Sequence, residues 1–274
     1  MKGSLRAVTR NWTDLRHTKY GTRPLGVVVF AGLATGVTGA ASGYAGPFIL
    51  KDLRVDIQSI LGLRSVLGFL LIFAAIGLGW WADRHKRVPL LAIGNMIAGF
   101  FSMITAGAHN LFAYGAPTLV GGVAAEASDV PSFSLMADYY PPETRGKVFS
   151  VLGIVRNAAA LPLIIAGALL LDWIGWRKVF LLGGAISMFV GLVMLRMLRE
   201  PVRGYMERQA MGATEEEALE ESEPQSFGEA WRTVWAVRTL RRQFVAIAIG
   251  APGSVIFASL SQFLLAEEYG LKSA

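Results

Sequence analysis

Two carboxylates stand close together in a segment that is otherwise apolar. Glu126 and Asp129 lie within AEASDVPSF, and they are the only charged residues between Leu111 and Met136. A carboxylate is costly in an apolar environment unless it pairs with a cation, binds a proton or lines a cavity that water can reach. The setting of these two residues therefore favours ion pairing or reversible protonation.

Asp129 has a basic residue at a matching depth on the next apolar run. If the helix over 111–137 ends near Asp138 and the next rises from about Lys147, Asp129 lies nine residues above the first end and Arg156 nine above the second. At 1.5 Å per residue both lie about 13 Å deep, on consecutive antiparallel helices. We predict an Asp129–Arg156 ion pair, which either locks the two helices together or takes part in function.

Glu126 lies one helical turn deeper, at about 18 Å, where the sequence does not identify a matching cation. We predict that Glu126 faces a cavity and binds a proton reversibly. Pro131 and Ser132 follow it, and they are expected to loosen the helix and let it bend.

The composition indicates a membrane protein. Hydrophobic residues make up 53% of the 274, charged residues only 17%, and the mean hydropathy is +0.46. The chain has no cysteine, and its three histidines are scattered, so we expect no disulfide, no metal site and no cofactor. No HExxH, GxSxG or CxxC constellation occurs, so no catalytic residue is indicated. The net charge of +6 comes from short loops between apolar runs, a pattern typical of membrane topology and not of nucleic-acid binding.

Seven apolar runs approach the length of about 20 residues that crosses a bilayer. They are continuous rather than alternating, which favours helices over strands. Their expected bounds are 25–48, 63–82, 88–107, 111–137, 148–171, 177–196 and 243–266.

The basic residues give these runs an orientation. With a cytoplasmic N-terminus, the inside segments hold 19 of the 26 Lys and Arg residues and the outside segments hold six. This bias predicts a multi-pass protein of the cell membrane whose N-terminus is cytoplasmic. The same topology, and the lack of a lysine in the seventh run, disfavour a seven-helix receptor or photosensor.

The chain divides into four regions. We expect a cytoplasmic N-terminus (1–24), a six-helix transmembrane bundle (25–196), a cytoplasmic loop (197–242) and a seventh transmembrane helix with its outer end (243–274). Within the loop, 214–225 is acidic and is expected to be a solvated tether. The stretch 226–235 begins with Ser226 and Glu229 at capping-box spacing, and its aromatic residues share one helical face, which predicts a short helix at the membrane surface.

The stretch GWWADRHKRVPLL, 79–91, is the most specific motif. Gly79 permits close helix approach, Asp83 can accept charge-assisted hydrogen bonds, and Arg84, Lys86 and Arg87 hold the loop in the cytoplasm. A related pattern, DWIGWRKVFLL, begins at Asp172, so the six helices are expected to repeat as three plus three.

The motif resembles the signature G-x-L-A-D-R-x-G-R-K, which lies between helices 2 and 3 in the major facilitator superfamily. Gly79, Ala82, Asp83, Arg84 and Arg87 match, whereas Trp81 replaces Leu and Lys86 replaces the second Gly. The stretch 122–152 is similar to the segment from helix 4 to helix 5 in this superfamily. It contains EAS, a proline and then ADYYPPETRG, which includes Asp138, Arg145 and Gly146, and this form is closest to the Spinster-like branch. LREPVRG at 198–204 is also similar to that branch.

The resemblance implies the six-helix N-terminal half of a twelve-helix fold, followed by the loop and helix 7, so we interpret the chain as a truncated or partial transporter. An Arg usual in early helix 4 is missing around Leu119, so the role of that Arg is not carried over. Close packing or bending is expected at glycines of helix 1 (Gly36, Gly39, Gly43 and Gly46), at Pro131, and in helix 7 at Gly250, Pro252 and Gly253.

The implied function is secondary transport of a small organic or amphiphilic, lipid-like solute, coupled to protons, by rocking of two halves. Asp83, Arg84, Arg87, Asp138 and Arg145, near Gly79 and Gly146, would form a charge cluster that latches one state. The expected partners are the bilayer, the solute, protons and the missing C-terminal half. The alternative is a non-transporting remnant, or a membrane-embedded partner or sensor protein.

Overall fold

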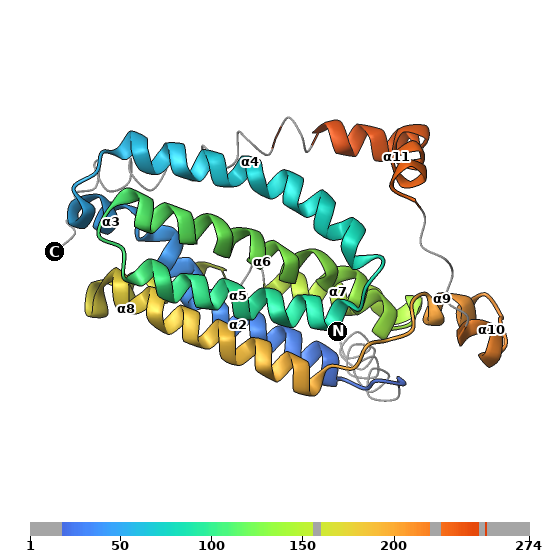
Figure 1. The fold of residues 1–274 in the computed structure, drawn as a ribbon. Helices are drawn as coiled ribbons and strands as arrows, with labels where there is room; N and C mark the ends of the chain where they lie inside the picture. The colour runs from blue at the N-terminus through green and yellow to red at the C-terminus, as the bar shows by residue number, and fades with distance from the viewer. Residues whose placement is uncertain (1–17, 156–159, 220–225, 247–249, 251–274) are drawn as a thin grey trace, which may run out of the picture.

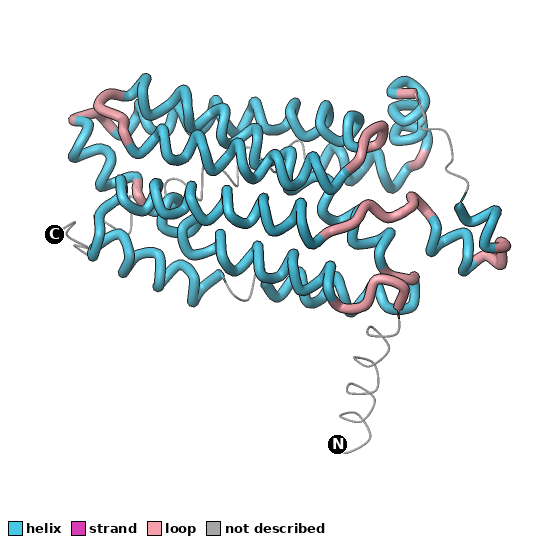
Figure 2. Tube along the Cα trace, turned by 60° about the horizontal axis from the view of Figure 1, so that its bottom comes forward, coloured by secondary structure: helices cyan, strands magenta, loops and turns pink. Residues whose placement is uncertain are grey.

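The computed structural model describes residues 18–155, 160–219, 226–246 and 250. Within these residues the regular structure is helical, and no strand occurs among them. Long helices lie side by side (Figure 1), and the loops gather at the two ends of the bundle (Figure 2). The predicted all-α fold class is confirmed. We call the end that carries the 83–86 loop the motif end and the other the opposite end.

The helices of the described bundle are α2 (Arg23–Tyr44), α3 (Gly46–Leu53), α4 (Ile57–Ala82), α5 (Arg87–Ala106), α6 (Leu111–Tyr139), α7 (Pro142–Gly153) and α8 (Ala160–Met197). Shorter helices follow at α9 (Tyr205–Ala210), α10 (Glu215–Leu219) and α11 (Phe227–Ala236), and residues 238–246 are also helical. Parts of the prediction lie outside the described residues: Arg156, Pro252, Gly253 and most of the N-terminal segment and of the seventh span.

Proline and glycine set two boundaries in the second half of the bundle, of which the first differs from expectation and the second lies in the predicted gap 172–176. Tyr140 is extended (φ −123°, ψ 138°) because it precedes Pro141, and Pro142 then begins α7, so the predicted 138–147 loop is only a tight turn. Gly175 (φ 76°, ψ 161°) breaks α8 into a first arm, 160–174, and a second arm, 176–197. Residues other than glycine rarely adopt that conformation.

The first predicted span ends earlier than expected. α2 stops at Tyr44, and α3 begins with Gly46 and Pro47, so the chain turns before it continues into α4. α4 begins at Ile57, before the predicted start at 63, and Asp56 there accepts a hydrogen bond from Ser59. Proline at the start of a helix is favoured because it lacks an N–H that would have no partner.

The helices pack in the order α4, α6, α5, α8, α2, so α4 lies at one edge of the bundle (Figure 1). Glycines bring the central backbones together. A Cβ added at Gly99 of α5 would lie 2.5 Å from the carbonyl oxygen of Gly184 in α8, and one at Gly191 would lie 2.6 Å from that of Ala92. Small residues at such crossings are typical of membrane helices.

The close packing expected at Gly39, Gly43 and Gly79 is not found. A Cβ at Gly39 or Gly43 would meet no described atom within 4 Å, and one at Gly79 would lie 3.8 Å from Val130, an ordinary contact. Helix α2 instead approaches α8 through Gly167 and Gly183 on the α8 side. The bending role of Gly43, which lies one residue before the end of α2, stays a prediction.

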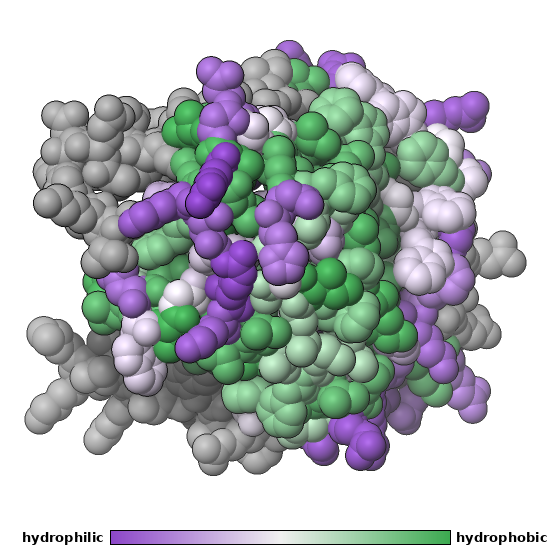
Figure 3. Space-filling model, turned by 60° about the vertical axis from the view of Figure 1, so that its left-hand side comes forward, coloured by the Kyte–Doolittle hydropathy of each residue, from purple (hydrophilic) through white to green (hydrophobic). Residues whose placement is uncertain are grey.

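Four described helices are long and apolar enough to cross a membrane: Arg23–Tyr44, Ile57–Ala82, Arg87–Ala106 and Ile165–Met197. The α6 helix is 29 residues long but is not among them, and it carries Glu126 and Asp129. Figure 3 shows a broad hydrophobic area bordered by hydrophilic side chains. The described surface is therefore suited to lipid along the sides of the bundle and to water at its two ends.

The helix predicted at 226–235 is confirmed as α11, whereas its place at the membrane surface stays a prediction. Ser226 is its N-cap, and the Glu229 N–H donates to Ser226 Oγ while Ser226 N–H donates to the Glu229 carboxylate at 2.9 Å. This reciprocal pair satisfies two donors that the first helical turn would otherwise leave without a partner.

Candidate functional site

Arg87 is the centre of a charge cluster at the motif end. It is the first residue of α5, it is buried, and its guanidinium forms an ion pair with Asp138, the penultimate residue of α6. The two residues are separated by 51 positions in sequence. Packing of α5 on α6 thus brings together two charges that the sequence predicted to share a cluster.

Glu200, which follows α8, joins this pair. Its carboxylate accepts hydrogen bonds from the backbone N–H groups of Arg87 and Val88, each at 2.8 Å, and lies 3.8 Å from Arg87 Nε. These N–H groups belong to the first turn of α5, where the helix provides no acceptor and its dipole favours a negative charge. Glu200 therefore holds the end of α8 against the start of α5.

The second oxygen of Asp138 binds the chain beyond α8. The N–H of Gly204 donates to Asp138 at 3.0 Å, and Gly204 has φ 65°, a value that suits glycine. Arg203 next to it donates to the carbonyl oxygens of Ala82 at 2.6 Å and His85 at 2.5 Å. The segment after α8 therefore connects Asp138 to both sides of Asp83 in the motif loop.

Arg145 lies near this cluster but binds other groups. Its Nε donates to the carbonyl oxygens of Ala137 at 2.9 Å and Tyr140 at 3.1 Å, and its Nη1 forms an ion pair with Glu207 at 2.7 Å. Arg145 thus closes the turn between α6 and α7 and ties it to α9.

Tyrosines cover the cluster on the α2 side. The Tyr140 hydroxyl donates to the Gly21 carbonyl at 3.0 Å and accepts from the Leu25 N–H at 3.2 Å. Tyr20 packs edge-on against Tyr139, with ring centroids 5.0 Å apart. Burial raises the pKa of the Tyr20 phenol, so this ring remains a neutral cover over the charges.

Two predicted members of the latch do not join it. Asp83 is exposed at the end of α4, and none of the ion pairs found within the described ranges involves its carboxylate. Arg84 packs over Trp80, 4.2 Å from the ring centroid. Asp83 lies outside the buried cluster because α4 ends before the turn that buries Arg87. Gly146 is exposed on α7 and has open space beside it.

Glu200, Gly204 and Glu207 were not predicted. A signal for Glu200 and Gly204 was present in LREPVRG (198–204), which is similar to the Spinster-like branch, but nothing local shows that the Glu200 carboxylate binds backbone N–H groups of α5; Glu207 lies beyond this motif.

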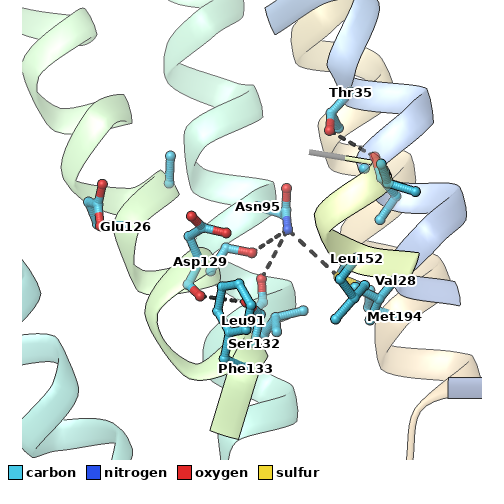
Figure 4. Close-up of a pocket in the computed structure, with 15 residues that line it drawn as sticks. Val28, Thr35, Leu91, Asn95, Glu126, Asp129, Ser132, Phe133, Leu152 and Met194 are labelled. Carbon is cyan, nitrogen blue, oxygen red and sulfur yellow. Dashed lines mark hydrogen bonds between the residues drawn. The ribbon is translucent and has the colours of Figure 1, made fainter. Parts of the chain in front are cut away.

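A cavity of about 300 Å³ lies in the half of the bundle nearer the motif end (Figure 4). At its centre, the Asn95 amide donates to Ser128, to the Leu91 carbonyl at 3.3 Å and to Met194 Sδ at 3.7 Å. The cavity has mixed walls, with apolar side chains and a few polar groups, and its lining is Val28, Ala31, Gly32, Thr35, Leu91, Asn95, Ala125, Glu126, Ser128, Asp129, Ser132, Phe133, Leu152, Val155 and Met194.

Both predicted carboxylates line this cavity. Glu126 is half-buried and Asp129 is exposed, and Figure 4 shows them on successive turns of α6. The structure thus brings to one cavity two residues to which the sequence assigned different surroundings. The predicted partner Arg156 lies outside the described residues, so the Asp129–Arg156 pair stays a prediction.

The α6 helix is continuous through Pro131, although proline removes a backbone donor. The Ser132 hydroxyl donates to the Asp129 carbonyl at 2.6 Å, and the Ser134 hydroxyl to that of Pro131 at 3.0 Å. These bonds support the backbone beside the cavity, and the bending role of Pro131 stays a prediction.

A second cluster lies at the opposite end. Asp52 of α3 forms an ion pair with Arg177 and accepts a hydrogen bond from the Trp176 indole at 2.9 Å. Arg177 also donates to the Ala108 carbonyl at 2.8 Å. No group of three or more His, Cys, Asp or Glu residues suited to a metal ion occurs in the part of the chain that the structure describes.

Comparison with known proteins gives a consistent result. A sequence profile of the Major Facilitator Superfamily matches residues 27–274. The chain is 26% identical over 168 residues to the 4-hydroxybenzoate transporter PcaK of Pseudomonas aeruginosa, a match that covers 61% of this chain and 38% of that protein. It is 23% identical over 177 residues to the probable galactarate/D-glucarate transporter GudP of Bacillus subtilis, covering 59% of this chain and 37% of that protein.

A solved structure shares the fold. A bacterial homologue of the human lysosomal transporter Spinster, in an inward-facing and unoccupied conformation, has a TM-score of 0.64 at 20% identity. That match covers 93% of this chain and 57% of the other. The chain thus spans less than two fifths of the length of the curated relatives named above.

Proposed function

The chain belongs to the Major Facilitator Superfamily, and on this premise we propose that it comprises the six-helix N-terminal half, the connecting loop and the seventh helix of a secondary transporter that moves a small organic solute by alternating access. It is a multi-pass membrane protein, as its long apolar helices and its relatives indicate. The second half of the transporter is part of the proposal, because the curated relatives are more than twice as long as the region they share with this chain.

The cavity is the observation that carries the proposal. It lies between α2, α5, α6, α7 and α8, and its volume of about 300 Å³ is at the lower end for small-molecule sites. Asn95 and Ser128 supply directed hydrogen-bonding groups, and Val28, Leu91 and Leu152 supply apolar wall. A second half that packs against this face would enlarge and close the site.

We propose that Asp83 is the moving part of the latch and that the Arg87–Asp138–Glu200 cluster is its fixed base. The cluster is buried and hydrogen-bonded, whereas Asp83 is exposed between two carbonyl groups that Arg203 holds. An exposed carboxylate on a fixed loop can exchange a partner on the second half without disturbing its own half. This arrangement biases an equilibrium between two states and leaves the fold intact.

Glu126 is our proposed proton site. A half-buried carboxylate in a cavity can bind a proton when the cavity opens to water and release it when the surroundings change. Asp129 lines the same cavity and exposes more of its side chain.

The proposed substrate is a small organic or amphiphilic compound. PcaK is named for 4-hydroxybenzoate and GudP for galactarate and D-glucarate, which are organic compounds. The mixed lining of the cavity supports the same class, because polar groups set the orientation of a ligand whose apolar part contacts the walls.

Flux into vesicles tests the function. The chain is joined to a matching second half, and uptake of 4-hydroxybenzoate and of a lysolipid is measured against an imposed pH gradient. We expect uptake of at least one. Absence of flux for both, with correct insertion, would favour the non-transporting alternative.

Glu126→Gln tests the proton site in the same assay. Glutamine keeps the shape of the side chain but cannot exchange a proton, so transport should lose its pH dependence. Glu143→Gln, at an exposed position of α7, is the matched control and should keep the pH dependence of transport. An unaltered pH profile in Glu126→Gln rules out this assignment.

The proposed orientation places the motif end in the cytoplasm, as the bias of basic residues indicates. Because the chain has no cysteine, a single cysteine introduced at Ser226 or at Ser59 is the one thiol that a reagent can label, and its labelling shows on which side of the membrane that residue lies. An impermeant thiol reagent applied to intact cells should label Ser59→Cys at the opposite end and spare Ser226→Cys. The reverse pattern would invert the topology.

A further inference from the structure

An aromatic cluster joins α11 to the helical residues 238–246. Phe227 stacks on Trp231 at 6.4 Å between ring centroids, and Trp231 contacts Trp235 at 5.7 Å. Phe244 closes the cluster against Trp231 at 5.6 Å and Trp235 at 6.1 Å. The chain bends between the two helices at Val237, so four aromatic rings from two short helices form one apolar surface.

These aromatic residues are only partly buried. Phe227 is 48% exposed, Trp231 40% and Trp235 38%, although they contact one another. The rings therefore keep a substantial part of their surface in contact with solvent, and the cluster is only partly buried. Its exposed face is therefore available to an apolar surrounding outside the protein.

Arginines border this surface. Residues 226–246 contain Arg232, Arg238, Arg241 and Arg242 and a single acid, Glu229. Glu229 is engaged in the capping box of α11, and the four arginines are exposed. No ion pair found among residues 18–155, 160–219 and 226–246 involves them. The segment thus combines an aromatic face with a net positive charge of its own.

The acidic residues of α10 are held elsewhere. Glu215, Glu216 and Glu217 belong to α10, whose Ala218 is fully buried in a cluster with Tyr205 and Met206 of α9. Arg208 of α9 also donates to the Ala218 carbonyl at 2.9 Å. The carboxylates of α10 are therefore carried by a helix that is fixed against α9.

The position of the segment matches the depth of lipid headgroups. α11 lies beside the motif end of α4, apart from the packed bundle (Figure 1), where Trp80 and Trp81 are also exposed. The helical residues 238–246 lead directly into the predicted span 243–266. Tryptophan and arginine are enriched where membrane helices meet the interface, and juxtamembrane arginines attract anionic lipids.

We propose that α11 and residues 238–246 form a docking surface for anionic phospholipid headgroups in the leaflet at the motif end. The aromatic rings insert between the lipids, and Arg238, Arg241 and Arg242 bind their phosphates. Membrane insertion of the chain is all that this requires, so the proposal stands whether or not the protein transports a solute.

The test uses the full chain in nanodiscs that hold one copy each. A single cysteine at Thr239 carries a dansyl label, and protection from the neutral quencher acrylamide is measured. In discs with about one third anionic phosphatidylglycerol we expect a blue-shifted, protected label, and in pure phosphatidylcholine an exposed one. High salt should release the label in the anionic discs, because it screens exposed charges.

Charge variants separate headgroup binding from simple burial of the rings. Replacing Arg238, Arg241 and Arg242 with glutamine should lower the docking equilibrium constant about 100-fold, because each basic residue near an anionic surface contributes about 1 kcal/mol. Lysine at all three positions should keep most of the docking, because lysine carries the same charge as arginine. The matched control, glutamine at Lys51, Arg54 and Lys178 of the opposite end, removes the same charge and should change nothing.

Three results would overturn the proposal. Equal protection in the two kinds of disc would mean that the aromatic rings alone hold the segment. Protection that survives the glutamine variant would exclude the arginines. Protection that appears only in vesicles at high protein density would identify a second copy of the chain as the occupant.

Discussion

The two ends of the bundle use the same ion pairing in different surroundings. At the motif end Arg87, which begins α5, pairs with Asp138 near the end of α6; at the opposite end Arg177, near the start of the second arm of α8, pairs with Asp52 of α3, beyond α2. The first three-helix unit consists of α2 with α3, α4 and α5, and the second consists of α6, α7 with the first arm of α8, and the second arm of α8. Each arginine lies at the start of the third helix of its unit, and each aspartate lies near the end of the first helix of the other unit. This exchange agrees with the predicted three-plus-three repeat.

Burial separates the two pairs. The side chains of Arg87 and Asp138 are 6% and 12% exposed, whereas those of Arg177 and Asp52 are 38% and 41% exposed. At the motif end, the segment after α8 covers the charges and contributes Glu200 and Gly204. At the opposite end, the pair shares its surface with solvent and relies on Trp176 and the Ala108 carbonyl.

The difference determines what each pair contributes. Removing one partner from a buried pair leaves a charge without water or counter-charge, whereas an exposed pair exchanges protein contacts for water at little cost. We infer that the motif end is a fixed structural base and that the opposite end is held mainly by its apolar cluster around Trp176 and Phe180.

The largest expected effect is that of Asp138→Asn. It leaves the buried Arg87 guanidinium with only the Glu200 carboxylate, 3.8 Å from Nε, as counter-charge and should cost about 3–5 kcal/mol in the free energy of unfolding. Asp52→Asn is the matched change at the opposite end and should cost less than about 1 kcal/mol. Thermal unfolding of the detergent-solubilised protein measures both, and equal shifts in Tm would break the comparison.

Glu200→Gln should have the next largest effect. Glutamine offers one carbonyl oxygen where the carboxylate accepts from two N–H groups, so one donor of α5 loses its partner, at about 1–3 kcal/mol. Glu207→Gln removes a carboxylate that is mostly exposed and should change Tm little. The decrease in Tm should be larger for Glu200→Gln than for Glu207→Gln, and the opposite order would contradict the prediction.

Salt should distinguish the two pairs more finely. A double-mutant cycle on Asp52 and Arg177 should give a coupling energy of about 1 kcal/mol or less that fades as salt rises, because solvent ions screen exposed charges. The Arg87–Asp138 coupling should not fade, since salt has no access to it. Parallel salt dependence of the two cycles would show that the burial difference has no energetic consequence.

Asp83→Asn should change stability least, within about 0.5 kcal/mol, because the carboxylate is exposed. In a twelve-helix version it should nevertheless reduce flux sharply, whereas Lys86→Gln in the same loop should not. Loss of stability in Asp83→Asn would mean that this residue belongs to the structural base and not to the moving latch.

Much of the fold could be read from the sequence, because its signals are local. Apolar runs set the long helices, and the Ser226–Glu229 spacing marks where α11 begins. The motif around Asp83 and the profile match lead to the same family. The break at Gly175 falls within the predicted gap 172–176, whereas the break at Ala45 was not predicted, since several nearby residues could end a helix.

The pairing of distant groups was decided only by the tertiary structure. The sequence contains Glu200, but its partners are backbone N–H groups 113 and 112 residues away, which no side-chain pattern encodes. It contains glycines throughout, but only helix crossing selects Gly99 and Gly184 as contacts and leaves Gly39 and Gly43 in open space. It places Asp83 and Arg87 in one motif, and the turn at the end of α4 then exposes the first and buries the second, because burial depends on which neighbouring helix covers each residue.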